Sequence, residues 1–161
     1  MPLSKSEISY KLNLSKELEG ETLSKKKEIK RAVAKFVLEE IESFTKSEVS
    51  PVTDHGFDPL NKAYAKVKKK LGKGSKADLH LKGKMISSIK AVTGGIDSVV
   101  FKINQKKQLK KAFNHITGDT LPKRPFLPND KLGVKSKYGS FSPSIKSGIR
   151  DIIKGLKNGK G

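Results

Sequence analysis

The segment that decides the fold spans residues 22–45, TLSKKKEIKRAVAKFVLEEIESFT. Its apolar residues recur at steps of three and four, which places them on one side of a helix; they are Ile29, Val33, Phe36, Val37, Ile41 and Phe44. The other side carries charges suited to water, namely Lys26, Lys30, Lys35, Glu39 and Glu42. We therefore expect a long amphipathic helix from about Thr22 to Thr45. It ends before Ser50-Pro51, because proline restricts the preceding backbone.

Two further helices are expected before residue 95. Asp58-Pro59 supplies a capping residue followed by proline at the first helical position. This second helix has an apolar row to bury, Leu60, Tyr64, Val67 and Leu71, and a lysine surface, Lys62, Lys66, Lys68, Lys69 and Lys70. A third helix, capped by Asp78 and closed by Gly94-Gly95, aligns Leu81, Met85, Ile89 and Val92.

The following segment combines two strands, two helices and extended chain. Val99, Phe101 and Ile103 alternate with Val100 and Lys102, which indicates a strand. The spacing from Gln105 to Ile116 predicts a helix, and three prolines in residues 121–128, LPKRPFLP, require extended chain. A short strand is expected around Leu132–Val134. A last helix starts at Ser142-Pro143 and aligns Ile145, Ile149, Ile152, Ile153 and Leu156.

These elements predict an α+β fold in one domain, in which a long N-terminal helix and several shorter helices pack on a small antiparallel sheet. Residues 1–21 carry only a thin apolar series, Ile8, Leu12, Leu14 and Leu18. We expect them to form a flexible N-terminal arm, or a short helix that orders against a partner. Residues 22–141 form the α+β core, and residues 142–161 a C-terminal amphipathic helix with a basic tail.

The charge of the chain is strongly uneven. Its 161 residues include 35 Lys+Arg and 16 Asp+Glu, a formal charge of +19. Residues 1–60 have a net charge of −1, and residues 61–161 carry +20. Such a field favours a polyanion as partner, either nucleic acid, an anionic membrane surface or an acidic protein ring. The alternative is a solvated lysine coat that only aids solubility.

Composition also excludes several classes of protein. Without cysteine there are no disulfides, no thiol catalysis and few options for structural zinc. No apolar stretch approaches the roughly 18 residues of a membrane span, and no apolar signal-peptide core opens the sequence. We therefore expect an intracellular protein with no membrane partner.

Catalytic chemistry finds little support among the residues. The three histidines, His55, His80 and His115, are scattered, so no metal site is expected. Residues 72–76, GKGSK, lack the glycine spacing of a phosphate-binding loop, and Ser87-Ser88 has no histidine partner in the pattern. We expect no enzyme and no cofactor. A nuclease would need a cluster of acids or histidines that the sequence does not offer.

Contact with nucleic-acid phosphates is the chemistry that the lysines favour. The candidates that face DNA form two clusters: Lys66, Lys68, Lys69, Lys70, Lys73 and Lys76, then Lys106, Lys107, Lys110 and Lys111. Lysine dominates over arginine, and aromatic residues are not interleaved with the charges. Base reading uses arginine forks, amides or stacking rings. Binding should therefore be independent of base sequence and strongly weakened by salt.

Several local patterns together resemble the tail-completion and virion-morphogenesis proteins of tailed bacteriophages. They are Ser50-Pro51-Val52 after the first helix, residues 60–68 (LNKAYAKVK), residues 77–89 (ADLHLKGKMISSI), and Phe113-Asn-His115 followed by a glycine and Arg124-Pro-Phe-Leu-Pro128. The family has a Thr where this chain has Lys82, and a glycine directly after the histidine. The resemblance covers about residues 28–130, and Arg124-Pro-Phe-Leu is its strongest part.

The resemblance implies a non-enzymatic virion protein of the neck or tail end, assembled in the host cytoplasm. It implies a homo-oligomeric, sixfold ring around the channel for genomic DNA, next to head-tail adaptor or connector proteins and tail terminator or tail tube proteins. The motif residues are then structural or interface positions: Gly83, Met85, Ile89, His115, Arg124, Pro125, Phe126 and Leu127. Arg124 either pairs across a subunit interface or clips the helix core of its own chain.

The alternative function is a free nucleic-acid-binding protein without sequence preference. The two functions differ in what the apolar surface is for. A neck protein needs subunit interfaces, so its N-terminal arm and C-terminal helix should order only in the assembly. A free binder should be well ordered alone.

Overall fold

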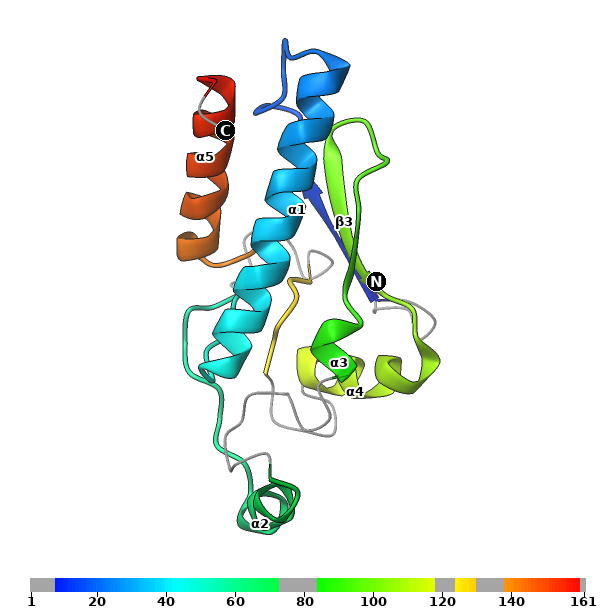
Figure 1. Cartoon of the computed structure of the whole chain (residues 1–161). Coiled ribbons are helices and arrows are strands. Elements are labelled where there is room, and N and C mark those ends of the chain that lie inside the picture. The colour runs from blue at the N-terminus through cyan, green and yellow to red at the C-terminus, as the bar shows by residue number, and fades with distance from the viewer. Residues whose placement is uncertain (1–7, 73–83, 118–123, 130–137, 160–161) are drawn as a thin grey trace.

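A computed structural model describes residues 8–72, 84–117, 124–129 and 138–159. Its elements, in chain order, are β1 (Ile8–Asn13), α1 (Leu23–Lys46), α2 (Lys62–Lys70), α3 (Lys84–Ser87), β2 (Lys90–Val92), β3 (Ser98–Ile103), α4 (Lys106–Thr117) and α5 (Pro143–Lys157). The strands form one antiparallel sheet, and α1 lies between this sheet and α5 (Figure 1). The expected α+β class with a long N-terminal helix is confirmed.

Helix α1 has the expected bounds to within one residue. Its first turn is capped by Thr22, whose side-chain oxygen accepts a hydrogen bond from Lys25 N at 3.2 Å. The expected apolar row faces the interior, with Phe36 and Phe44 half-buried, and four of its members have no exposed surface: Ile29, Val33, Val37 and Ile41. Removing one such side chain from water contributes about 1.5–3 kcal/mol. This row is therefore the centre of the core.

Lys30 departs from the pattern of α1, because it was expected on the water-facing side and is only 5 % exposed. Its ammonium donates to the carbonyl oxygens of Gly95 at 2.5 Å and Ile96 at 3.2 Å, in the turn between β2 and β3. One turn earlier, Lys26 pairs with Asp97 at 3.0 Å. Helical periodicity does not reveal such a position, since a lysine can bury its stem and still bring its charge to backbone oxygens. Two lysines thus fix the hairpin turn to α1.

The central strand is β3, with β1 on one side of it and β2 on the other. The register of β1 and β3 sets buried or half-buried apolar residues opposite one another, Ile8 with Ile103, Tyr10 with Phe101 and Leu12 with Val99. Phe141 packs edge-on against Tyr10 and Phe101, with ring centroids 5.3 and 5.9 Å apart. The strand expected over Val99–Ile103 is confirmed.

The expectation of a flexible arm or short helix over residues 1–21 is wrong for its described part. Residues 8–13 form β1, and beyond them Leu14 and Leu18 are buried in the core. Leu14 N also donates to Asp97 O at 2.7 Å. Few apolar residues are visible in this segment because a strand with one solvent-exposed face buries only every second residue. Its pairing partner, β3, is also remote in the sequence.

The third expected helix is wrong at its C-terminal end. Helix α3 is described as Lys84–Ser87, and β2 begins at Lys90. Gly94-Gly95 accordingly belongs to the hairpin turn and does not close a helix. Pairing with β3 takes the place of the helical continuation that the spacing of Ile89 and Val92 predicted. Other expectations lie outside the described residues: Asp78, Leu81, Gly83 and the strand around Leu132–Val134.

The remaining helices agree with expectation except at one end. Helix α4 is confirmed over its predicted range, and α5 starts behind its predicted cap, Ser142, which accepts from Ile145 N at 3.4 Å. Helix α2 begins later than the predicted start at Asp58. Asn61 is its cap and accepts from Tyr64 N at 2.8 Å.

Helices α1 and α5 approach each other closely at Gly148. The inward side of α5 is apolar, with Ile145, Ile149, Ile153 and Leu156 buried. A Cβ atom at position 148 would overlap the Phe36 ring of α1. Glycine at this position therefore sets the distance between the two helices.

We predict that Gly148→Ala lowers the free energy of unfolding by about 1–3 kcal/mol, the usual cost of overpacking. The same change on an open helix surface gains up to about 1 kcal/mol, because alanine is the better helix former. Urea denaturation measures the difference. Ser147→Ala, one residue earlier and exposed, is the matched control. A Gly148→Ala protein more stable than the wild type would contradict the close approach.

Candidate functional site

The strongest motif of the sequence, Arg124-Pro-Phe-Leu, lies inside the protein. Phe126 and Leu127 have no exposed surface, and Arg124 is 3 % exposed. The guanidinium of Arg124 donates from Nε to the Asp58 carbonyl and from Nη2 to the Pro59 carbonyl, each at 3.0 Å. Of the two roles considered for Arg124, this geometry corresponds to a clip within one chain.

A second contact ties the same two segments together. The Ser50 hydroxyl donates to the Pro125 carbonyl at 2.6 Å and accepts from Val52 N at 3.1 Å. The loop of residues 50–59 is therefore held to residues 124–125 at both of its ends. Because α2 follows this loop directly, the clip also fixes where α2 leaves the body.

His115 completes the clip. Its carbonyl accepts from Arg124 N at 2.8 Å. Burial lowers the pKa of His115 from its usual 6.5 to about 4, and the charge of Arg124 adds to this shift. The side-chain Nδ1 is buried and has no hydrogen-bond partner among the described residues. The neutral imidazole is therefore a packing group here.

Met85 and Ile89 also belong to the core, each 6 % exposed. All the described motif residues are thus buried or half-buried, and Gly83 lies outside the described residues. Their placement is that of packing positions, and none of the described ones is classed as exposed.

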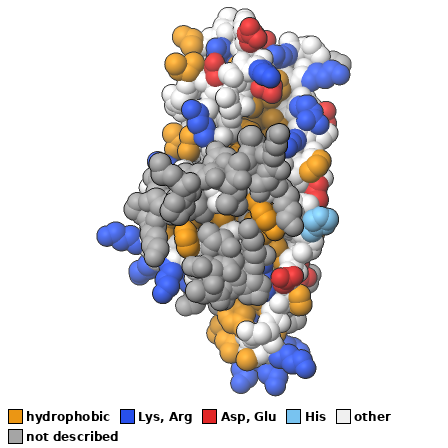
Figure 2. All heavy atoms as spheres, turned by 180° about the vertical axis from the view of Figure 1, so that it is seen from behind, with side chains coloured by type: hydrophobic (Ala, Val, Ile, Leu, Met, Phe, Trp, Pro, Cys, Tyr) orange, Lys and Arg blue, Asp and Glu red, His pale blue; other side chains and the backbone are white. Residues whose placement is uncertain are grey.

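The first lysine cluster is only partly available to a ligand. Lys66, Lys69 and Lys70 are exposed on α2, but Lys68 is 2 % exposed and cannot face DNA in this arrangement. Lys73 and Lys76 lie outside the described residues. In Figure 2 lysine and arginine side chains gather at the lower end of the molecule, where Figure 1 has α2.

The expected inward row of α2 is wrong as well. Tyr64, Val67 and Leu71 are among the most exposed large hydrophobic residues of the described chain, with Val67 at 51 % and Leu71 at 56 %. The helix turns Lys68 inward and these residues outward. Periodicity identified the apolar row correctly, but it cannot say which side of a helix meets the core.

The second lysine cluster is arranged as predicted. Lys106, Lys107, Lys110 and Lys111 are all exposed on α4, and Leu109, Ala112 and Ile116 face the core. The four ion pairs of the described residues all use lysines of α1. The exposed lysines of α4 therefore have no acidic partner among the described residues.

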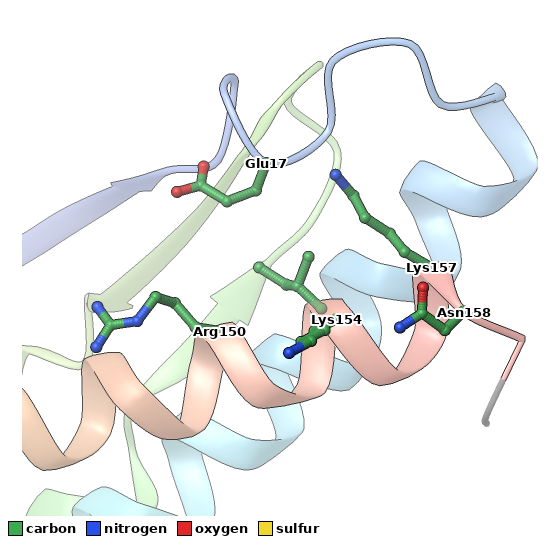
Figure 3. A pocket seen from close by; sticks show the side chains of 6 residues that line it. Glu17, Arg150, Lys154, Lys157 and Asn158 are labelled. Carbon is green, nitrogen blue, oxygen red and sulfur yellow. The ribbon is translucent and has the colours of Figure 1, made fainter.

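A third basic surface was missed in the sequence. Lys146, Arg150, Lys154 and Lys157 are exposed on α5, at spacings of four, four and three residues. Three of them line a hollow of about 250 Å³ together with Glu17, Ile153 and Asn158 (Figure 3). The spacing of these four residues is visible in the sequence, on a different side of the helix from its isoleucine row.

The described surface is suited to binding anions. In the described part of the chain, no three His, Asp or Glu side chains come together in a group that could hold a metal ion. Among the same residues, no helix is both long and apolar enough to cross a bilayer. Compared with models of known protein families, with curated proteins and with solved structures, the chain matches none.

We predict that Arg124→Met lowers the free energy of unfolding by about 2–3 kcal/mol, because charged hydrogen bonds to two carbonyls are lost. Urea denaturation measures this loss, and Arg31→Met, an exposed arginine of α1, is the control. Sedimentation of the same variant gives its oligomeric state. A variant with wild-type stability and altered assembly would instead place Arg124 at a subunit interface.

The lowered pKa of His115 predicts a dependence of stability on pH. The unfolded chain takes up a proton at His115 near pH 6.5, but the folded chain does so only near pH 4. Stability therefore falls as the pH drops from about 6.5 to about 4, by up to about 3 kcal/mol. His115→Gln should remove this part of the dependence, whereas His55→Gln, at an exposed histidine, should retain it. Parallel curves for wild type and His115→Gln in denaturation at several pH values would refute the assignment.

Proposed function

We propose that this chain is a non-enzymatic structural protein of a tailed bacteriophage virion. In this proposal it acts at the neck or tail end, in tail completion or head-tail joining, as a homo-oligomeric ring around the DNA channel. Its neighbours are head-tail adaptor or connector proteins on one side and tail terminator or tail tube proteins on the other. The proposal draws on the motif resemblance and on the surface of α2.

The carrying observation is the exposed surface of α2, formed by Val67, Leu71, Lys66, Lys69 and Lys70. Apolar residues gathered on one projecting helix are typical of an interaction site. The helix lies at one end of the molecule (Figure 1). The Arg124 clip holds the residues before it at fixed carbonyls, so the helix is presented in a defined place.

The occupant that we propose for this surface is a second copy of the chain. The lysines of α2 require an acidic neighbour, and the last turns of α1 expose Glu39 and Glu42. Among the described residues Glu39 lies 4.0 Å from Lys35 and Glu42 2.7 Å from Lys46, and both of these pairs are exposed. Such pairs contribute little and are readily exchanged. A contact from α2 of one copy to α1 of the next is head-to-tail, the type that closes into rings.

The alternative, a free sequence-independent nucleic-acid-binding protein, is favoured by a different observation. The neck function predicted that the N-terminal arm and the C-terminal helix order only in the assembly. This expectation is wrong for the described residues, since β1 pairs with β3 and α5 packs on α1 within one chain. A protein whose ends are already packed has less need of a partner to fold.

Sedimentation separates the two functions. We predict a mass several times 17.7 kDa for the wild type, six times for the expected ring. Val67→Ser combined with Leu71→Ser should weaken assembly at least tenfold, because exposed apolar anchors dominate such interfaces. Leu23→Ser with Ile96→Ser removes two apolar residues that are even more exposed and lie away from α2, and it is the control.

A wild-type protein that remains monomeric at all concentrations would reject the ring in favour of the free binder. Equal effects of the two double variants would reject α2 as the contact. Mass spectrometry of purified virions tests the location independently, since a neck protein must be present at a fixed copy number.

A further inference from the structure

Helix α5 carries four exposed basic side chains and is packed firmly against the core. Its apolar residues are buried against the core, so the helix cannot rotate to hide its charges. We call its exposed cations the α5 basic row: Lys146, Arg150, Lys154 and Lys157. At 100° per residue, spacings of four, four and three place them along one side of the helix, over roughly 16 Å at 1.5 Å per residue.

The row borders the hollow of about 250 Å³ between α5 and the segment that joins β1 to α1 (Figure 3). Arg150, Lys154 and Lys157 line it from successive turns of the helix, Asn158 adds an amide, and Ile153 contributes an apolar side chain. Glu17 is the one acid of its lining and comes from the opposite segment. The four ion pairs of the described residues lie elsewhere. The hollow therefore holds more positive than negative charge.

The stability of the helix does not account for the row. Cations near a helix C-terminus complement the helix dipole, which explains Lys154 and Lys157. Lys146 lies near the N-terminus of the helix, where a cation is unfavourable, and the first turn has no acid to offset it. Arg150 lies at the middle of the helix, where the dipole has little effect on it. Like charges four residues apart also repel. A bound anion would relieve both unfavourable terms.

We propose that the α5 basic row binds the phosphodiester backbone of nucleic acid without reading its bases. This inference deepens the proposed function, on which it rests for the presence of DNA beside the protein. It assigns the contact to a helix outside the two lysine clusters found in the sequence. Successive cations stand about 6 Å apart along the helix, so several phosphates of one strand can be bound together.

Two other polyanions fit the surroundings of the row less well. A bilayer is bound by helices that bury an apolar face in it, but the apolar face of α5 is already packed inside the protein. An acidic protein partner would need apolar anchors beside the charges. The large exposed hydrophobic residues of the described chain lie on other segments, namely Leu23, Tyr64, Val67, Leu71, Val92 and Ile96.

Titration of duplex DNA at several salt concentrations tests the proposal. Two unrelated sequences should bind equally to the wild type. Arg150→Gln combined with Lys154→Gln should lower the slope of log K against log salt by about 2, and affinity more than tenfold at about 0.1 M salt. Glu17→Gln should strengthen binding a few-fold, because it removes a repelling carboxylate from the hollow.

The matched control is Lys27→Gln combined with Arg31→Gln, which removes the same two charges at the same spacing from an exposed side of α1. It should leave the slope close to that of the wild type. Equal losses in both double variants would show that only net charge matters and would overturn the proposal. The proposal would also be overturned if the wild type bound no DNA at low salt. It would be overturned too if polyglutamate or anionic vesicles of equal charge displaced bound DNA from the wild type as effectively as competing DNA does.

These outcomes separate the inference from the proposed function. Assembly is assigned to α2, so the α5 double variant should sediment like the wild type. If the α5 double variant assembled and bound DNA like the wild type, the α5 basic row would be rejected as the DNA contact, and the ring proposal would be unaffected. The ring proposal is tested without any DNA: it fails if the wild type does not assemble, and it is supported if the α2 double variant loses assembly.

Discussion

Helix α1 must bury side chains on two sides at once, and the rest of the structure depends on this constraint. The sheet covers one side and α5 the other, so both layers are placed by the same helix (Figure 1). Two local features follow from the double contact. At position 148 only glycine leaves room for Phe36, and near the hairpin turn Lys30 has to enter the interior. The charge of Lys30 is tolerated there because two carbonyl oxygens receive it.

The Arg124 clip links this core to the surface of α2. Three segments meet at Arg124, which bonds to the carbonyls of Asp58 and Pro59, remote in the sequence, and through its backbone to His115. A guanidinium suits this task because its planar fork can serve two oxygens in fixed directions. The Arg124-Pro-Phe-Leu segment, the strongest part of the family resemblance, thus holds the body together, whereas the surfaces open to partners lie on α2, α4 and α5.

The sequence predicted those parts of the fold that are encoded locally. Helices α1 and α5 have strong periodicity and capping residues, Thr22 and Ser142, so both were found at their observed starts. Strand β1 was missed because its pairing partner is remote. The burial of Lys30 and Lys68 was not predicted, because an argument from periodicity assigns every charged residue to the solvent-exposed side of a helix. For the candidate site, the lysines of α4 were placed correctly, but the outward turn of α2 and the α5 basic row required the packing of the whole chain.

The order of the strands also has a consequence for the route by which the chain folds. Between β1 and its partner β3 lie α1, α2, α3 and β2, so the pair closes the longest loop within the sheet. Closing it costs entropy before any contact compensates, and such non-local pairing slows folding. The β2–β3 hairpin, whose strands adjoin in sequence, can form first and serve as the template. We therefore expect β1 to be added after the hairpin, and until that step the inward residues Ile8 and Tyr10 would be open to chaperones or to other unfolded chains.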